Sequence, residues 1–229
     1  ARQGHVQEPG LRRLPAEGDR LANESCGNVG NGKCNFKKLN VMGWIIKETE
    51  TLLKTPIGSF NTTRKIDPEG VERKYISMDA PDWVCAIVQL GKDSDEFLMV
   101  RQFRHGINRE VVEFPSGMVD KGEEALQALV RELDEELGIA RGNIQSVKEL
   151  YTASPNPAFM ENRITCYFVV VDAYGNSHPD EDEFLETVIV KREEMESIVT
   201  QNDYNAMMRL AWEHALSIGL IAKKYDIKL

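Results

Sequence analysis

The chain has 229 residues, of which 28 are Lys or Arg and 37 are Asp or Glu, so its formal net charge is −9, and 41% of its residues are hydrophobic. A chain of this length can bury a core without disulfide or metal staples, and its composition excludes collagen-like, disordered and disulfide-scaffold proteins. Its longest apolar runs are far shorter than the roughly 20 residues of a membrane span, so we do not expect a membrane as a partner. Its acidic charge disfavours binding to nucleic acid, which we do not expect as a partner either.

The first residues, 1–37, are rich in Gly, Arg, Glu and Asn and contain few apolar side chains. Because such a segment cannot bury much surface, we interpret it as a flexible tail or the remnant of an expression tag. Residues 38–78 show strand signals instead, with a Pro- and Gly-containing turn at 67–70 followed by alternating residues at 71–78. They predict a hairpin meander, which we treat as an N-terminal β-rich segment.

Residues 79–229 make up the second predicted domain, which mixes short strands with two helices. The first helix follows Gly122, where Leu and Val repeat every three or four residues, and ends at Gly138. The second helix closes the chain at about 203–224. The predicted strands are 83–90, 97–103, 164–171 and 187–190. This mixture, without an internal repeat, predicts an α+β fold class and not a doubly wound α/β fold.

Four cysteines are present, and none has the C-x-x-C spacing of a zinc or redox site. Cys85 and Cys166 lie in apolar runs that predict buried strands, whereas Cys26 and Cys34 lie in the Gly-rich start. We interpret all four as free thiols of a cytoplasmic protein, because the start of the chain lacks the apolar core of a secretory signal. A Cys26–Cys34 disulfide is the alternative for an exported protein.

The first predicted helix carries three closely spaced carboxylates. Glu132 and Glu136 are one turn apart, and Glu135 is three residues from Glu132, so the three cluster along one side. Like charges at these spacings cost stability, which favours a cation between them. Oxygen ligands suit Mg²⁺, which also binds substrate phosphates. The helix alone fits a solvated acidic surface better, because Glu-rich helices are commonly solvated.

The wider pattern decides between these two interpretations. Gly117, five residues, Glu123, seven residues and then the run RELDEELGI at 131–139 match every defined position of the Nudix signature, G-x5-E-x7-R-E-U-x-E-E-x-G-U, where U is aliphatic. The chain therefore resembles the Nudix hydrolase superfamily. The resemblance implies the Nudix fold, a mixed β-sheet sandwiched between helices, and hydrolysis of a nucleoside diphosphate linked to another group.

The resemblance also implies a metal site. Glu132 and Glu136 match the principal ligands of Mg²⁺, or alternatively Mn²⁺, and Glu135 matches a direct or water-mediated ligand. The carbonyl of Ser116 is a further candidate ligand. The metal would neutralise the charge of a pyrophosphate so that water can attack it.

Three other positions of the signature are expected to support this site. Arg131 would hold a glutamate in place through a charge-assisted pair. Gly117 would let the backbone turn close to the metal. Glu123 is expected to stabilise the loop and not to touch the substrate.

The sequence around the signature resembles the ADP-ribose and ADP-sugar pyrophosphatase branch, with RQFR at 101–104 and EFPSG at 113–117. Arg104 is the candidate pyrophosphate contact, because a guanidinium binds phosphate oxygens in a bidentate way. Glu113 is a candidate substrate or loop ligand. Pro155 matches a proline typical of this branch, and Glu161 in the same loop is either functional or a solvated acid.

The general base of such enzymes often comes from an acidic loop before a late strand. Here the run HPDEDEFLE at 178–186 supplies Glu181, Glu183 and Glu186, of which we favour Glu183. A solvated acidic loop is the simpler alternative.

The resemblance finally implies a homodimer, because this branch pairs subunits through an N-terminal sheet like that predicted at 38–78. A small nucleoside diphosphate is the expected substrate. The alternatives are a hydrolase of another diphosphate, such as a dinucleotide cofactor, and a non-catalytic sensor of ADP-ribose-type ligands.

Overall fold

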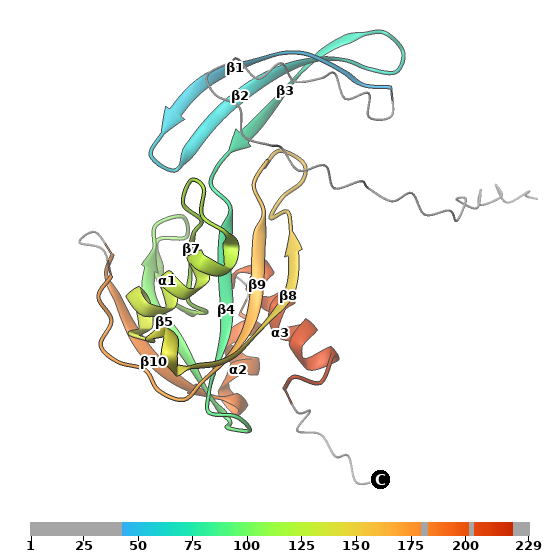
Figure 1. Ribbon diagram of the computed structural model, residues 1–229. Coiled ribbons are helices and arrows are strands. Elements are labelled where there is room, and N and C mark those ends of the chain that lie inside the picture. The colour runs from blue at the N-terminus through green and yellow to red at the C-terminus, as the bar shows by residue number, and fades with distance from the viewer. Residues whose placement is uncertain (1–42, 180–182, 202–203, 222–229) are drawn as a thin grey trace, which may run out of the picture. The chain divides into compact units, whose positions relative to one another are not determined.

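The fold is taken from a computed structural model, which describes residues 43–179, 183–201 and 204–221. All of them belong to one compact unit, Lys38–Leu229. The predicted tail with Cys26 and Cys34, and Glu181, lie outside the described residues, and a domain boundary after residue 78 stays a prediction. The elements in chain order are β1 (Ile45–Thr55), β2 (Gly58–Ile66), β3 (Glu72–Asp79), β4 (Trp83–Leu90), β5 (Glu96–Arg104), β6 (Arg109–Glu113), β7 (Ser116–Met118), α1 (Ala125–Leu137), the 3₁₀ turn η1 (Arg141–Asn143), β8 (Ile144–Ala153), β9 (Ile164–Val171), β10 (Leu185–Lys191), α2 (Arg192–Val199) and α3 (Ala206–Ser217) (Figure 1).

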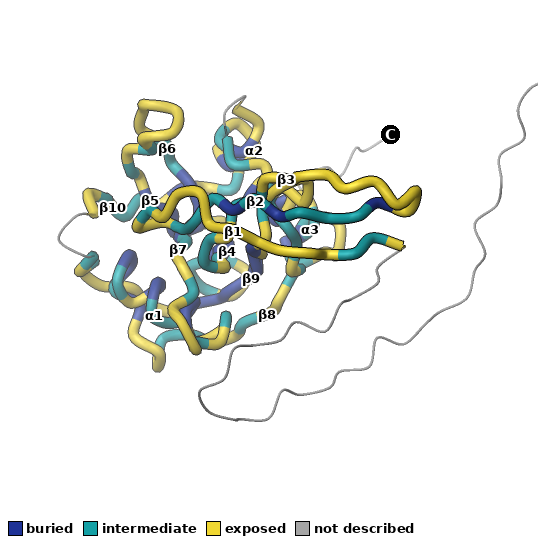
Figure 2. The backbone as a smooth tube through the Cα atoms, turned by 90° about the horizontal axis from the view of Figure 1, so that it is seen from above, coloured by how far each residue is buried: buried dark blue, intermediate teal, exposed yellow. Residues whose placement is uncertain are grey.

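The predicted hairpin meander is confirmed as an antiparallel sheet of β1, β2 and β3. Its second turn forms at Asp67, whose side chain accepts hydrogen bonds from the backbone amides of Glu69 and Val71. Hydrogen bonds of this kind hold Asx turns. Most of β1 and β3 is exposed, in contrast to the buried strands β4 and β9 (Figure 2).

The second sheet has seven strands, with β10, β5, β4, β9 and β8 side by side, β6 paired to β5 and β7 paired to β4. The sheet is mixed, because β4 and β9 are parallel while the other pairs are antiparallel. The strand predicted at 164–171 is confirmed and is buried along its whole length. Burial on both faces explains why its sequence is apolar except for Thr165.

Helices cover both faces of this sheet. Val84, Ala86 and Val88 of β4 belong to the core cluster that contains the buried side of α1. Cys85 and Ile87 belong to the other cluster, which contains the buried sides of α2 and α3. Alternate side chains of one strand thus supply two cores. The predicted α+β class, with a mixed sheet between helices, is confirmed.

The closing helix is shorter than the predicted 203–224. Asn205 caps the start of α3 by accepting a hydrogen bond from the amide of Met207. The helix ends at Ser217 because Gly219 adopts a φ of 74° and the amide of Leu220 turns back to the carbonyl of Ala215, a Schellman-type stop. In the described part of the chain, no helix combines the length and apolar character that crossing a membrane requires.

Besides the short turn η1, the sequence-based prediction missed three strands and one helix, namely β6, β7, β8 and α2. β6 and β7 are only 5 and 3 residues long, and β8 is an edge strand that mixes exposed and half-buried residues, so none has a clear apolar period. α2 is a single two-turn helix directly after β10.

Candidate active site

The acidic side of α1 is partly buried, which sets it apart from a solvated acidic helix. Glu132 is 9% exposed and Glu136 only 2%. A capping box between Glu124 and Gln127 fixes the start of the helix, and Gly138 ends it with a left-handed φ of 60°. Both ends are therefore set by local sequence, and the packing of Leu129 and Leu133 against β4 fixes the rotation of the carboxylates relative to the sheet.

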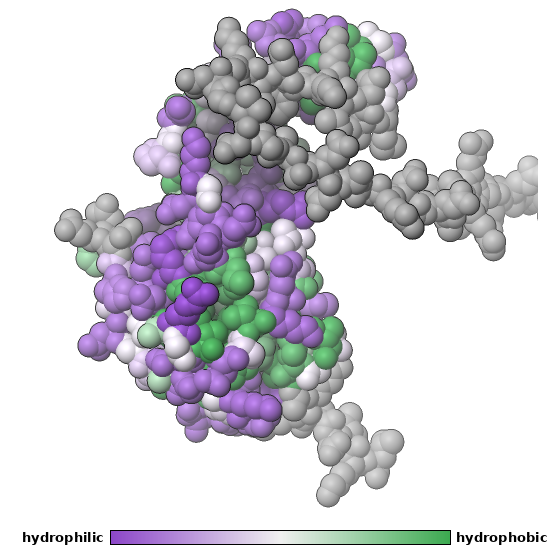
Figure 3. All heavy atoms as spheres, viewed as in Figure 1, coloured by the Kyte–Doolittle hydropathy of each residue, from purple (hydrophilic) through white to green (hydrophobic). Residues whose placement is uncertain are grey.

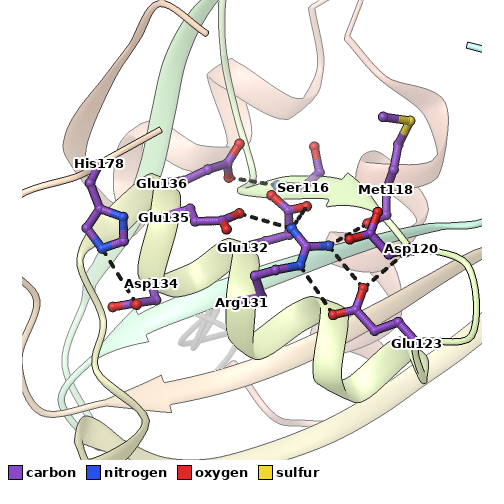
Figure 4. Close-up of polar contacts among 10 residues, drawn as sticks. All are labelled: Ser116, Met118, Asp120, Glu123, Arg131, Glu132, Asp134, Glu135, Glu136 and His178. Carbon is purple, nitrogen blue, oxygen red and sulfur yellow. Dashed lines mark hydrogen bonds and ion pairs between the residues drawn. The ribbon is translucent and has the colours of Figure 1, made fainter. Parts of the chain in front are cut away.

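Arg131 is the centre of a network that joins the signature residues (Figure 4). Its guanidinium donates to both carboxylate oxygens of Glu123 at 3.2 and 3.1 Å, to Glu132 at 2.8 Å and to Glu135 at 3.0 Å. It also donates to the carbonyl of Met118 at 2.8 Å. The hydrogen bond to Glu123, with those to Glu132 and Glu135, raises the pKa of Arg131. The predicted pairing of Arg131 with a glutamate is thus found with three of them.

Glu123 has the position expected of a loop stabiliser. Its carboxylate accepts from the amide of Asp120 at 3.0 Å as well as from Arg131, and these bonds lower the pKa of Glu123. The charge of Arg131 therefore ties the loop before α1 to the helix itself.

Glu136 and Glu132 are held as buried carboxyls. The backbone amide of Ser116 donates to Glu136 at 3.0 Å. Burial, and then the charge of Glu132, raises the pKa of Glu136 well above its usual range, and the charge of Glu183 acts in the same direction. Burial also raises the pKa of Glu132. Two buried acids that repel each other are costly to ionise unless a cation joins them.

Gly117 lies directly against this pair. A Cβ atom at position 117 would be 1.9 Å from the carboxyl carbon of Glu132. The φ of Gly117 is not in the left-handed region, so the requirement is for space and not for an unusual backbone. β7 holds Gly117 opposite Val84 of the central strand β4. The absent side chain is what allows Glu132 to approach the backbone.

Arg104 and Glu113 form an ion pair at the ends of β5 and β6. Glu113 is 4% exposed, and its burial raises its pKa, while Arg104 opposes this rise. The charge of Arg104 also acts on Glu136. The structure therefore brings the candidate phosphate-binding arginine into electrostatic reach of the acidic cluster.

Pro155 and Glu161 lie in the 154–163 loop between β8 and β9, called here the downstream loop. The carboxylate of Glu161 accepts a hydrogen bond from the hydroxyl of Ser77 in β3. Glu161 is exposed, so the choice between a functional role and a solvated acid stays a prediction. The oxygen of the Ser154 hydroxyl, next to Pro155, is buried without a hydrogen-bond partner among the described residues.

Glu183 lies two residues before β10, and its charge raises the pKa of both Glu132 and Glu136. The chain before it is anchored on the end of α1. The amide of Gly175 donates to the carbonyl of Leu137 at 3.2 Å, and the amide of His178 donates to that of Glu135 at 2.7 Å. This end of the helix thus holds the chain at Gly175 and His178.

The donor set of this cluster fits a divalent cation. Within the described ranges, no group of three or more acidic, His or Cys side chains is gathered in metal-binding geometry, and Arg131 contacts both Glu132 and Glu135. The repulsion between buried Glu132 and Glu136 is nevertheless of the kind that a hard, oxygen-binding cation offsets. The predicted role of the Ser116 carbonyl as a ligand stays a prediction; its amide binds Glu136.

A hollow of about 670 Å³ opens on another side of α1, lined mainly by apolar residues. Figure 3 shows apolar surface in this region, bordered by polar residues. The lining includes Leu126, Val130, Ile144 and Val147 together with Arg131, but none of the three acidic candidates. The acidic cluster and not this hollow is therefore the candidate active site.

Sequence reasoning missed three contributors to this site. The carbonyl of Met118 and the amide of Ser116 act through the backbone, which side-chain patterns do not reveal. Ser77 lies 84 residues from its partner Glu161. Ser116 itself was named from the sequence, because it adjoins Gly117 of the signature, but for its carbonyl and not for its amide.

Comparison with known proteins agrees with this geometry. Residues 81–210 match the NUDIX domain. The chain is 30% identical over 125 residues to the ADP-ribose pyrophosphatase of Bacillus subtilis, covering 53% of this chain and 66% of that protein. It is 27% identical over 179 residues to the ADP-ribose pyrophosphatase of Saccharomyces cerevisiae, covering 71% and 76%. The matched part thus spans just under two thirds of the Bacillus protein.

A solved structure is also similar. The crystal structure of an ADP compounds hydrolase superposes with a TM-score of 0.63 at 22% identity, covering 77% of this chain and 94% of that one. At this identity the likeness concerns the fold, which it places with the Nudix architecture predicted from the signature.

Proposed function

This chain belongs to the NUDIX family, and we propose that it hydrolyses the pyrophosphate bond of ADP-ribose, or of a related nucleoside diphosphate sugar, to AMP (or another NMP) and a sugar phosphate. The observation that carries the proposal is the buried pair Glu132 and Glu136, each with a raised pKa, on a helix whose rotation is fixed. A pair of this kind is explained by a cation that also meets an anionic substrate. The names of the relatives support the substrate class.

Glu132 and Glu136 would hold the divalent cation, with Glu135 and the carbonyl of Ser116 as further candidate ligands. Mg²⁺ is expected, with Mn²⁺ as an alternative, since all of these ligands are oxygens. When bound, the cation supplies neutralisation of the phosphate charge and a lowered pKa for its water.

The protein side chains would then divide the remaining work. Arg104 binds phosphate oxygens, and buried Glu113 orients its guanidinium. Arg131 keeps Glu132 and Glu135 in place through its fixed network. Glu183 accepts a proton from the attacking water, with the neighbouring Glu181 as the alternative base.

The test is a panel of ADP-ribose, other nucleoside diphosphate sugars and dinucleotides, incubated with the protein and Mg²⁺. Release of AMP and ribose 5-phosphate from ADP-ribose is the expected result, and addition of chelator should abolish it. Preferential cleavage of a dinucleotide would replace the proposed substrate. Tight binding of ADP-ribose without turnover of any compound would instead favour a sensor.

We also propose that the protein is a homodimer that pairs through the β1–β3 sheet. Several large apolar side chains of this sheet and of its first turn are exposed, among them Leu52, Leu53, Ile57 and Ile76. Exposed apolar surface of this extent commonly marks an interface. Light scattering at micromolar concentration should give twice the mass of the chain, and a monomer would contradict the proposal.

A cytoplasmic location is proposed as well. Cys85 and Cys166 are neighbours on β4 and β9 and are both free thiols. Free thiols are the usual state in a reducing compartment. Cell fractionation of the native organism tests this directly.

A further inference from the structure

The segment that joins the two sheets, residues 78–83, runs beside the second half of the downstream loop. The amide of Met78 donates to the carbonyl of Phe159 at 2.8 Å, and the amide of Glu161 donates to that of Met78 at 2.9 Å. At the other end, the amide of Trp83 donates to the carbonyl of Arg163 at 2.8 Å, where the β4–β9 pairing begins. The loop is thus paired at both ends of the segment.

Between these ends the strand-like pairing is interrupted. Pro81 has no amide hydrogen, and its carbonyl accepts from the side chain of Asn162 at 3.0 Å. The amide of Arg163 therefore needs another acceptor. The carboxylate of Asp82 supplies it, at 2.7 Å. The side chain of Asp82 thus supplies the acceptor that the backbone pairing lacks at this point.

Asp82 also reaches the opposite part of the site through its backbone. Its carbonyl accepts from the amide of Val119 at 2.8 Å. Val119 follows Met118, whose carbonyl binds Arg131 of the acidic cluster. One residue therefore connects the downstream loop to the entrance of α1, although Asp82 itself is exposed.

We propose that Asp82 is a positioning residue, which holds the downstream loop in register with the acidic cluster by accepting the hydrogen bond from Arg163. Loss of the bond frees the loop that carries Pro155 and Glu161, so substrate binding weakens while the carboxylates of α1 stay in place. The kinetic part of this inference rests on the proposed function, because it assigns those two residues to substrate binding.

The kinetic test compares Asp82→Ala with Asp82→Asn, which keeps an acceptor oxygen but loses the charge. With ADP-ribose and saturating Mg²⁺, Asp82→Ala should raise KM by about three- to tenfold, the size of one lost hydrogen bond, and leave kcat within about twofold. Asp82→Asn should stay within about twofold of wild type in both constants. Asp79→Ala is the matched control, since it removes an equal charge three residues away.

Hydrogen exchange provides a readout that does not depend on activity. Peptides covering 154–163 should exchange faster in Asp82→Ala than in wild type, and peptides of α1 should not. If Asp82→Ala failed to fold, Asp82→Ser, with a shorter acceptor, would replace it in both measurements.

Three results would overturn the proposal: equal KM in Asp82→Ala and wild type, an Asp82→Asn variant as impaired as Asp82→Ala, or unchanged exchange in the loop. If wild type turned over no diphosphate at all, the proposed function would fail, and the exchange measurement would still decide the role of Asp82.

Discussion

Replacement of Gly117 by alanine is the sharpest single test of the active-site geometry. The added Cβ would lie 1.9 Å from the carboxyl carbon of Glu132, whereas ordinary van der Waals contacts begin at about 3.4 Å. Glu132 must therefore retreat by roughly 1.5 Å. That shift breaks its 2.8 Å hydrogen bond from Arg131 and moves a proposed metal ligand.

Gly117→Ala should lower activity much more than stability. The atoms that clash are at the far end of a flexible side chain, so we expect a loss of only about 1 kcal/mol in the free energy of unfolding, or roughly 2–4 °C in Tm. A misplacement of about 1 Å at a catalytic group can cost 100-fold in rate, so kcat should fall by about that factor or more.

The assay is steady-state hydrolysis of ADP-ribose with Mg²⁺, together with calorimetric melting. Gly142→Ala is the matched control, because a Cβ at that position meets nothing within 4 Å. It should leave both kcat and Tm near wild type. A Gly117→Ala enzyme with wild-type kcat would refute the reasoning, since Glu132 would then tolerate displacement.

Three further predictions concern the charges of the cluster. Glu136→Gln should lower kcat by about 100-fold or more. Because the pKa of Glu136 is raised in the folded state, the stability that its protonated form contributes is present below pH 4.5 and is lost as pH rises through the raised value. In chelator, the gain in Tm of Glu136→Gln over wild type should therefore grow from pH 4.5 upward, and a gain independent of pH would contradict this. Arg131→Lys keeps the charge but loses the multidentate hydrogen bonds, and should lower the free energy of unfolding by about 1–3 kcal/mol in urea titrations. An unchanged urea midpoint of unfolding would show that the network has no structural role. Glu183→Gln should lower kcat with little change in KM, while the control Glu186→Gln, a residue paired with exposed Arg101, should change neither; equal effects of the two would remove Glu183 as the base.

The part of the site that sequence could predict is the part made by neighbours along the chain. The i, i+3 and i, i+4 spacing of the glutamates and the stop at Gly138 follow from helix geometry alone. The contact between Gly117 and Glu132 does not, because it needs β7 paired to β4 and α1 packed on the same sheet. The resemblance to a family suggested that Gly117 matters, and the structure supplies the steric reason.

The remaining contacts depend on pairs that no local pattern brings together. The register of β5 and β6 places Glu113 opposite Val100 and Arg104 opposite Arg109, so the ion pair of Arg104 and Glu113 runs along the hairpin, and β6 was too short to predict. The bond from Arg163 to Asp82 joins positions 81 residues apart. The prediction made the closing helix too long for a local reason, since the apolar spacing of α3 continues past Ser217 while Gly219 reverses the backbone.

The pairing of β10 with β5 has a consequence for how the proposed base could evolve. Leu185 pairs with Gln102 at the start of an unbroken seven-residue ladder, so Glu183 is tethered only two residues, roughly 7 Å, from a fixed point on the sheet edge. A slip of one residue in this ladder would move Glu183 by about 3.3 Å and turn the side chains of β10 to the opposite face. The register of β10 against β5 thus sets how far the proposed base can reach from the sheet. An insertion between Glu183 and Leu185 would lengthen this tether and release the proposed base from its position relative to the sheet.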